Sequence, residues 1–219
     1  MLAVLAVELE VDVVLIAGDL FDHQRVKEPH VAEAFGVLGA LAATGVDCVV
    51  LCGNHDAHDE GSLYRRFGDH VERSGVQFLD DPDGRMVDLA DGRLSLWSRA
   101  LTDHSPTNRP LDGAPPHPGG GWYVVGGHGH FIDDPLYDSH RSSRITVDDI
   151  NAPGADYVAL GHWHVTTDLR PRGATTQAWY PGSPLFGYGS QNMLLVDFDP
   201  AAGVAVTPID VLARDRGCA

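Results

Sequence analysis

Apolar residues near the start of the chain alternate between runs of strand length and a segment with helical spacing. Residues 11–17 (VDVVLIA) and 46–51 (VDCVVL) are apolar runs rich in β-branched side chains, which predicts two buried strands. Between them, residues 31–43 place apolar side chains at helical intervals, and Gly45 follows as a stop signal. Residues 2–9 (LAVLAVEL) suit the end of a helix. This order of strand, helix and strand predicts a parallel βαβ unit.

The pattern changes beyond residue 75 to short apolar runs separated by turn signals. These runs predict further strands at Arg85–Leu89, Leu94–Trp97, Tyr123–Val125, Tyr157–Leu160, Met193–Phe198 and Val204–Val211. A succession of this kind indicates a second sheet packed on the first. We therefore predict an α/β fold, a two-sheet β-sandwich flanked by helices (αββα), built as a single domain over residues 1–219.

One long segment between these runs has no regular pattern. Residues 105–121 (SPTNRPLDGAPPHPGGG) contain five prolines and four glycines. Such a composition disfavours both helix and strand, because proline lacks an N–H donor and glycine is conformationally free. We interpret the segment as a surface loop, with a lid as the alternative.

Four glycine-led polar clusters follow predicted strands. They read GDLFD (18–22), GNHD (53–56), GHGH (127–130) and GHWH (161–164). Ligand sites in open α/β sheets lie at the carboxyl ends of strands. A glycine there lets the backbone turn sharply, so that the next side chain points into a cleft. If the last cluster stays extended, strand alternation places His162 and His164 on the same side.

The clusters supply a carboxylate (Asp19), an amide oxygen (Asn54) and imidazoles (His128, His162 and His164). This set of donors suits Mn²⁺, Fe²⁺ or Zn²⁺ better than Ca²⁺ or Mg²⁺. Each residue alone has an ordinary explanation, because Asp and Asn are common in turns and caps and histidine is common on surfaces. Four such clusters at predicted strand ends are hard to obtain by accident, so together they indicate a metal site.

The chain is strongly acidic, with a formal net charge of −16 from 31 acidic and 15 basic residues. Nucleic-acid binding depends on clustered basic side chains that neutralise phosphates. The small groups of arginine at 65–73 and 141–144 form no basic stripe, and we interpret them as solvated surface. Metal ions would therefore supply most of the positive charge at a phosphate site.

The cysteines favour a reducing, cytoplasmic location. Cys48, Cys52 and Cys218 are too few for a disulfide framework, and the first two share one apolar run. We interpret Cys52 as a buried strand thiol. The apolar opening segment contains acidic residues and no basic n-region, so we predict neither a signal peptide nor a membrane span.

At these clusters the chain resembles the calcineurin-like metallophosphoesterase family, whose ordered motifs are D-x-H, G-D-x-x-D, G-N-H-[DE], G-H and G-H-x-H. The last four correspond to Gly18-Asp19 with Asp22, Gly53–Asp56, Gly127-His128 and Gly161–His164. The resemblance spans roughly residues 10–200. The segments DYVALGHWH and WYPGSP are most similar to the bacterial SbcD-type DNA-repair exonuclease branch.

The resemblance implies two divalent metal ions, with Mn²⁺ favoured and Fe²⁺ or Zn²⁺ as alternatives. Asp19 would bridge the two ions, and His164 would reach the first of them. Asn54, His128 and His162 would complete the second. Two such ions clamp the attacking and leaving oxygens of an in-line displacement and lower the pKa of bound water. The implied activity is hydrolysis of a phosphodiester or phosphomonoester by a metal-activated hydroxide.

The resemblance also implies two catalytic residues that do not bind metal. His55 would protonate the leaving oxygen, and Asp56 would hold His55 in place. Asp22 would either support the site from outside or be an ordinary loop residue. We expect His130 to be neither a ligand nor a substrate contact.

The first family motif, D-x-H, is absent from the eighteen residues before Asp19. The first ion would then keep only Asp19 and His164, and the first strand of the fold would be missing. We interpret the chain as an N-terminally incomplete domain, from a late start codon or a fragment, with a degenerate relative as the alternative.

Two further functions stay open. A DNA exonuclease of the SbcD type is favoured by the flanking segments, but the acidic charge and the lack of a DNA-capping domain after Val211 oppose it. Such a nuclease would work with an ATPase subunit. A non-catalytic interaction domain is favoured by the missing motif. We expect a phosphate-ester substrate, with nucleic acid as the alternative, and no membrane partner.

Overall fold

The computed structural model describes residues 1–133, 141–185 and 189–211, so Cys218 lies outside the described residues. The first sheet is small and parallel, with the strands β1 (Val13–Ile16), β2 (Asp47–Leu51) and β3 (Gln77–Leu79) in the order β1-β2-β3. Val14 pairs with Cys48, and Val50 pairs with Phe78. The predicted βαβ unit is therefore confirmed.

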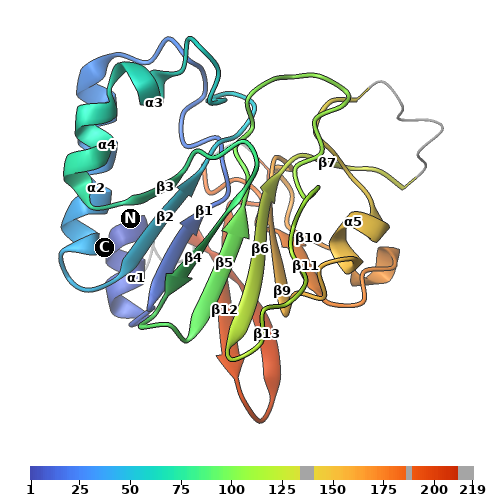
Figure 1. The fold of residues 1–219 in the computed structure, drawn as a ribbon. Coiled ribbons are helices and arrows are strands. Elements are labelled where there is room, and N and C mark those ends of the chain that lie inside the picture. Colours follow the sequence, from blue (N-terminus) through green and yellow to red (C-terminus); the bar gives the residue numbers. More distant parts are fainter. Residues whose placement is uncertain (134–140, 186–188, 212–219) are drawn as a thin grey trace.

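Four helices lie on the outer side of this sheet (Figure 1), namely α1 (Leu2–Glu8), α2 (Glu28–Ala42), α3 (Leu63–Arg66) and α4 (Gly68–Ser74). Side chains alternate along a strand, so Val14, Cys48 and Val50 face the helices and pack against Val31 and Phe35 of α2. The helix predicted between the two strands is confirmed, although it begins three residues earlier than expected at Glu28.

The second sheet has six strands in the order β10-β11-β9-β6-β5-β4. These are β4 (Arg85–Leu89), β5 (Leu94–Ser98), β6 (Trp122–His128), β9 (Tyr157–Gly161), β10 (Thr167–Asp168) and β11 (Gln177–Tyr180). Neighbours from β5 to β11 are parallel, whereas β4 and β10 pair antiparallel at the two edges. The parallel strands matter for function, because their carboxyl ends share one edge of the sheet.

The two sheets pack face to face around a shared apolar core. Val49 and Leu51 of β2 meet Leu96 and Val124 of the second sheet. A hairpin of β12 (Asn192–Asp199) and β13 (Gly203–Asp210) packs against the same core. Outside the second sheet lie α5 (Val147–Asn151), the short pair β7 (His130–Phe131) and β8 (Arg144–Ile145), and the 3₁₀ turn η1 (Arg170–Arg172).

These layers confirm the predicted αββα sandwich. Each layer boundary has its own apolar cluster, and Ile150 of α5 packs with Tyr123 and Val158 on the outer face of the second sheet. Among the described residues, none of the helices is long and apolar enough to cross a membrane.

Candidate metal centre

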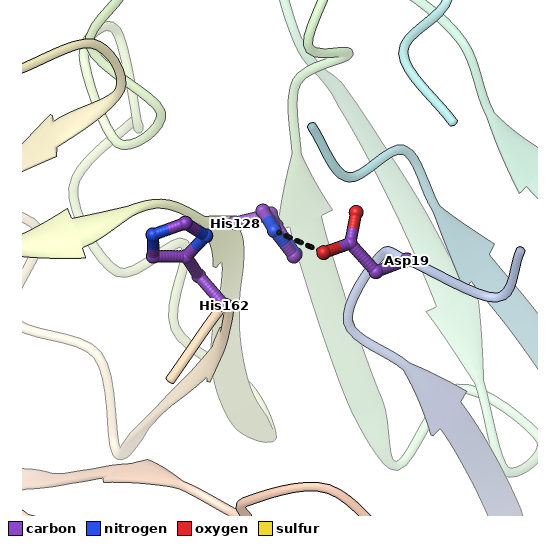
Figure 2. Close-up of side chains that lie close together, drawn as sticks. All are labelled: Asp19, His128 and His162. Atoms are coloured by element: carbon purple, nitrogen blue, oxygen red, sulfur yellow. Dashed lines mark ion pairs between the residues drawn. The ribbon is translucent and has the colours of Figure 1, made fainter. Parts of the chain in front are cut away.

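Four of the predicted ligand residues converge at the carboxyl ends of four strands. Asp19 follows β1 and Asn54 follows β2 in the first sheet. His128 ends β6, and His162 follows β9 in the second sheet, where His128 pairs with Gly161. Figure 2 shows Asp19 and His128 facing each other, with His162 beside them. The two sheets therefore meet at this point with their polar ends together.

The ligand atoms of these residues lie within reach of one ion. His128 Nε2 is 3.2 Å from Asp19 Oδ2 and 3.0 Å from Asn54 Oδ1. His162 Nδ1 is 2.8 Å from the same Asn54 oxygen. Asp19, His128 and His162 each offer a ligand atom within 4.8 Å of the others. A single cation fits among these donors.

The orientation of His128 is that of a metal ligand. Its Nδ1–H donates to the Ala17 carbonyl over 2.8 Å, which is the usual way that a ligating histidine is held by the protein. Nε2 then faces two oxygens that are themselves acceptors, Asp19 Oδ2 and Asn54 Oδ1. The lone pairs of Nε2 and of the two oxygens would repel one another at these distances. A positive charge between them removes this repulsion, and either a proton on His128 or a bound cation supplies it.

The electrostatics of the pair agree with this geometry. Burial disfavours charge on His128, but the Asp19 carboxylate outweighs it and holds the pKa of His128 above its ordinary value. Burial likewise raises the pKa of Asp19, but the hydrogen bond and charge of His128 outweigh it and lower that pKa overall. Burial, with the nearby charge of His128, lowers the pKa of His162 to about 4. His162 is therefore neutral near pH 7 and offers a lone pair.

The backbone around two ligands adopts left-handed conformations. Gly18 and Asp19 have φ values of 85° and 54°, and His162 has a φ of 110°. Left-handed non-glycine residues are uncommon and cluster at functional sites. β9 ends at Gly161, so the segment does not stay extended, and the condition for His162 and His164 to lie on one side is not met.

His164 is not among the residues whose ligand atoms lie within 4.8 Å of one another, although its charge acts on His162. The residue is exposed, and its backbone carbonyl accepts hydrogen bonds from the N–H groups of Ser183 and Ser190. These two bonds tie the segment after β9 to the segment before β12. The assignment of His164 to a second ion stays a prediction.

Two of the glycines are needed for close packing rather than for a turn. Gly53 and Gly161 do not have positive φ, unlike Gly18. A Cβ on Gly53 would overlap the Asp19 carboxylate, and one on Gly161 would overlap the Ala17 carbonyl oxygen. The glycines thus allow the ligand-bearing segments to approach each other, and only Gly18 serves as the predicted sharp turn.

We expect Gly161→Ala to destabilise the protein by about 1–3 kcal/mol, as overpacking in a closed site does. The added methyl would displace the Ala17 carbonyl and with it the His128 ring that the carbonyl holds. The midpoint temperature of thermal unfolding and the affinity for Mn²⁺ should both fall. Gly36→Ala is the matched control, because a Cβ there meets nothing in the middle of α2 and should stabilise the helix by about 0.5–1 kcal/mol. Equal effects of the two changes would contradict the packing argument.

His55 lies beside the cluster with its ring held by the backbone. Its Nδ1–H donates to the Asp22 carbonyl over 2.7 Å, and its backbone N–H donates to Asp19 Oδ1 over 2.8 Å. The Asp22 carboxylate is 3.9 Å from Nδ1 and is itself 95% exposed. The part of Asp22 that orients His55 is therefore its main chain.

Asp56 does not hold His55, contrary to the expectation. Its carboxylate is fully buried and accepts hydrogen bonds from the backbone N–H groups of Asp19, Phe21 and Gly53 and from the Tyr64 hydroxyl. Asp56 thus joins the loop after β1 to the loop after β2 through hydrogen bonds to their main chains. Sequence reasoning missed Tyr64, which lies outside the glycine-led motifs.

His130 lies beside His162, with ring centroids 5.8 Å apart. The Trp163 indole Nε1–H donates to His130 Nδ1 over 3.2 Å, and Trp163 stacks on Tyr180 with ring centroids 4.8 Å apart. The Tyr180 hydroxyl in turn donates to the Gly129 carbonyl over 2.8 Å. These contacts link the GHGH and GHWH clusters, and His130 is outside the group of close ligand atoms.

The proline- and glycine-rich loop supports the centre from the side. It has no helix or strand, as predicted, but Pro110 and Leu111 are buried against Gly127 and Gly129, on either side of His128 in the chain. The Arg109 guanidinium donates to both Asp149 oxygens over 2.7 Å and anchors the loop to α5. This part of the loop therefore packs into the protein, and the lid alternative stays a prediction.

Fold and site together define a class of protein, the hydrolases that hold divalent metal at the strand ends of an αββα sandwich. A comparison with family models supports this class directly, because residues 1–166 match the model for calcineurin-like phosphoesterase. The chain belongs to the calcineurin-like phosphoesterase family. A comparison with curated proteins found no match. In general terms the protein is thus a metal-binding hydrolase of phosphoester bonds.

Proposed function

We propose that the protein hydrolyses a phosphodiester or phosphomonoester with two divalent metal ions, of which Mn²⁺ is favoured and Fe²⁺ or Zn²⁺ are alternatives. The observation that carries this proposal is the convergence of Asp19, Asn54, His128 and His162 within the reach of one ion. Oxygen and imidazole donors together suit these borderline metals.

The residues divide between the two ions as follows. Asp19, Asn54, His128 and His162 would hold one ion, and Asp19 with His164 would contribute to the other. When bound, such ions neutralise charge on the phosphoryl oxygens and lower the pKa of water. The acidic chain has few basic residues to do this itself, since its formal net charge is −16.

His55 is proposed to deliver a proton to the leaving oxygen. Its Nδ1–H is committed to the Asp22 carbonyl, which leaves Nε2 as the ring atom that can transfer a proton. The side chain is 46% exposed, so a substrate can reach it. The His55 backbone N–H also donates to Asp19 Oδ1, which ties the loop of the proton donor to the loop of the metal ligand.

Turnover of chromogenic substrates tests the proposal. The chain, stripped of metal with a chelator, should be inactive towards bis(p-nitrophenyl) phosphate and p-nitrophenyl phosphate. Mn²⁺ should restore turnover of at least one of them. A chain that binds Mn²⁺ but hydrolyses neither substrate would favour the non-catalytic interaction domain instead.

A DNA exonuclease is the second candidate, favoured by the segment DYVALGHWH, which contains β9, and by WYPGSP, which begins at the end of β11. It would take nucleic acid as substrate and an ATPase subunit as partner, in the cytoplasm. Release of nucleotides from linear duplex DNA in Mn²⁺ would favour this candidate. Turnover of small phosphate esters without any hydrolysis of DNA would favour the general phosphoesterase over the exonuclease.

A further inference from the structure

A buried carboxylate lies where the two ligand-bearing loops of the first sheet meet. Asp56 Oδ1 accepts from the Gly53 N–H over 2.7 Å and from the Asp19 N–H over 3.2 Å. Oδ2 accepts from the Phe21 N–H over 3.2 Å and from the Tyr64 hydroxyl over 2.6 Å. Asp56 therefore bonds the main chain of one ligand, Asp19, and of the residue just before another, Asn54.

The Tyr64 hydroxyl comes to this carboxylate from a third segment. Tyr64 belongs to α3, which begins with Ser62 as its cap, the Ser62 hydroxyl accepting from the Tyr64 N–H over 3.2 Å. The tyrosine ring is buried and packs against Phe78, with ring centroids 4.3 Å apart, and against Phe21 at 6.2 Å. The ring has little freedom, so the position of its hydroxyl is set by the core.

A second link runs beside the first. The Gln24 amide donates to the Ala57 carbonyl over 2.6 Å and accepts from the Leu63 N–H over 2.8 Å. Arg66 also donates to the Gln24 carbonyl. The loop after β1, the loop after β2 and α3 are thus joined by two independent sets of hydrogen bonds, and the set through Asp56 and Tyr64 is the one nearest the ligands.

We propose that Tyr64, acting through Asp56, is a positioning residue that sets the separation of Asp19 and Asn54 and thereby the affinity of the metal centre. The inference rests on the metal site of the proposed function. Asp56 accepts hydrogen bonds from both loops, and the Tyr64 hydroxyl makes its shortest hydrogen bond. Without that bond the buried carboxylate lacks one hydrogen-bond donor, which costs free energy. We expect the two loops to shift so that the carboxylate finds another donor. Residues that orient ligands in this way affect metal affinity although they never touch the ion.

Tyr64→Phe isolates the hydroxyl because it keeps the ring. Tyr123→Phe is the matched control: Tyr123 is also fully buried, its hydroxyl donates to the Pro115 carbonyl over 2.9 Å, and it packs in the apolar cluster on the far side of the second sheet. Both variants lose one hydrogen bond of a buried tyrosine ring, so both should lose thermal stability in the presence of a chelator. Only one of them loses a contact to the ligand loops.

Calorimetric titration with Mn²⁺ should show that Tyr64→Phe binds about 10–100-fold more weakly than wild type, with Tyr123→Phe close to wild type. Equal affinity of Tyr64→Phe and wild type would overturn the inference alone, as would an equal loss in both variants. A wild-type chain that binds no Mn²⁺ would instead overturn the proposed metal-dependent function, and the inference with it.

Discussion

Replacing Asp19 with Asn should remove nearly all bound metal, although the two side chains have the same shape. Asp19 Oδ2 is the charged atom that faces His128 Nε2, and its other oxygen accepts the His55 N–H. An amide lacks the negative charge that attracts a cation and that holds the pKa of His128 up. Affinity for Mn²⁺ should fall by more than the roughly 10–100-fold that residues outside the ligand set contribute.

His162→Ala should have a similar effect, since it removes a neutral imidazole from the cluster. The control is His104→Ala, because His104 is an exposed residue of the segment before β6. Metal per chain after dialysis would be measured by elemental analysis for all three variants. Metal contents equal to that of wild type would show that the site lies elsewhere in the protein.

The second large effect is expected for His55→Ala, which should lower turnover by about 10²–10⁴-fold while metal content stays nearly unchanged. The ring is held through Nδ1–H, which donates to the Asp22 carbonyl and not to a metal ligand. The loss should depend on the leaving group. A p-nitrophenolate leaves without help, so its ester should be affected less than an alkyl ester, whose oxygen needs a proton.

His70→Ala serves as the control for that measurement. His70 pairs with Glu28 over 3.0 Å, which places it on the helical side of the first sheet. Loss of metal together with activity in His55→Ala would make His55 a ligand. A loss of turnover that is the same for both classes of ester would remove its role as the proton donor.

The strands of the core were predictable because their signals are local. β1 and β2 are short β-branched runs, and β4 was predicted at its observed bounds. β11 (Gln177–Tyr180) was missed because it contains no β-branched residue and is followed directly by Pro181. It becomes a strand by parallel pairing with β9, a partner that no local pattern reveals.

The candidate site was predictable as a set of side chains but not as a set of contacts. Glycine-led motifs identified Asp19, Asn54, His128 and His162, which the structure brings together. The partner of His55 was misassigned because it is a main-chain carbonyl, that of Asp22, and residue types say nothing about where a carbonyl points. Alternation failed at His162 because the backbone turns there with positive φ.

The origin of the ligands in four different strands has a consequence for how the protein folds. Contacts within the centre join residues 74, 108 and 111 positions apart in the chain. Such contacts are slow to form and come after the local ones, so the centre is complete only when both sheets have docked. An unfolded chain therefore offers no comparable site, and metal should bind the native state more tightly than the unfolded chain. Each tenfold increase in free metal above the dissociation constant then adds up to about 1.4 kcal/mol to the free energy of unfolding. The lifetime of the folded protein in a cell is thereby tied to the supply of the metal that it uses.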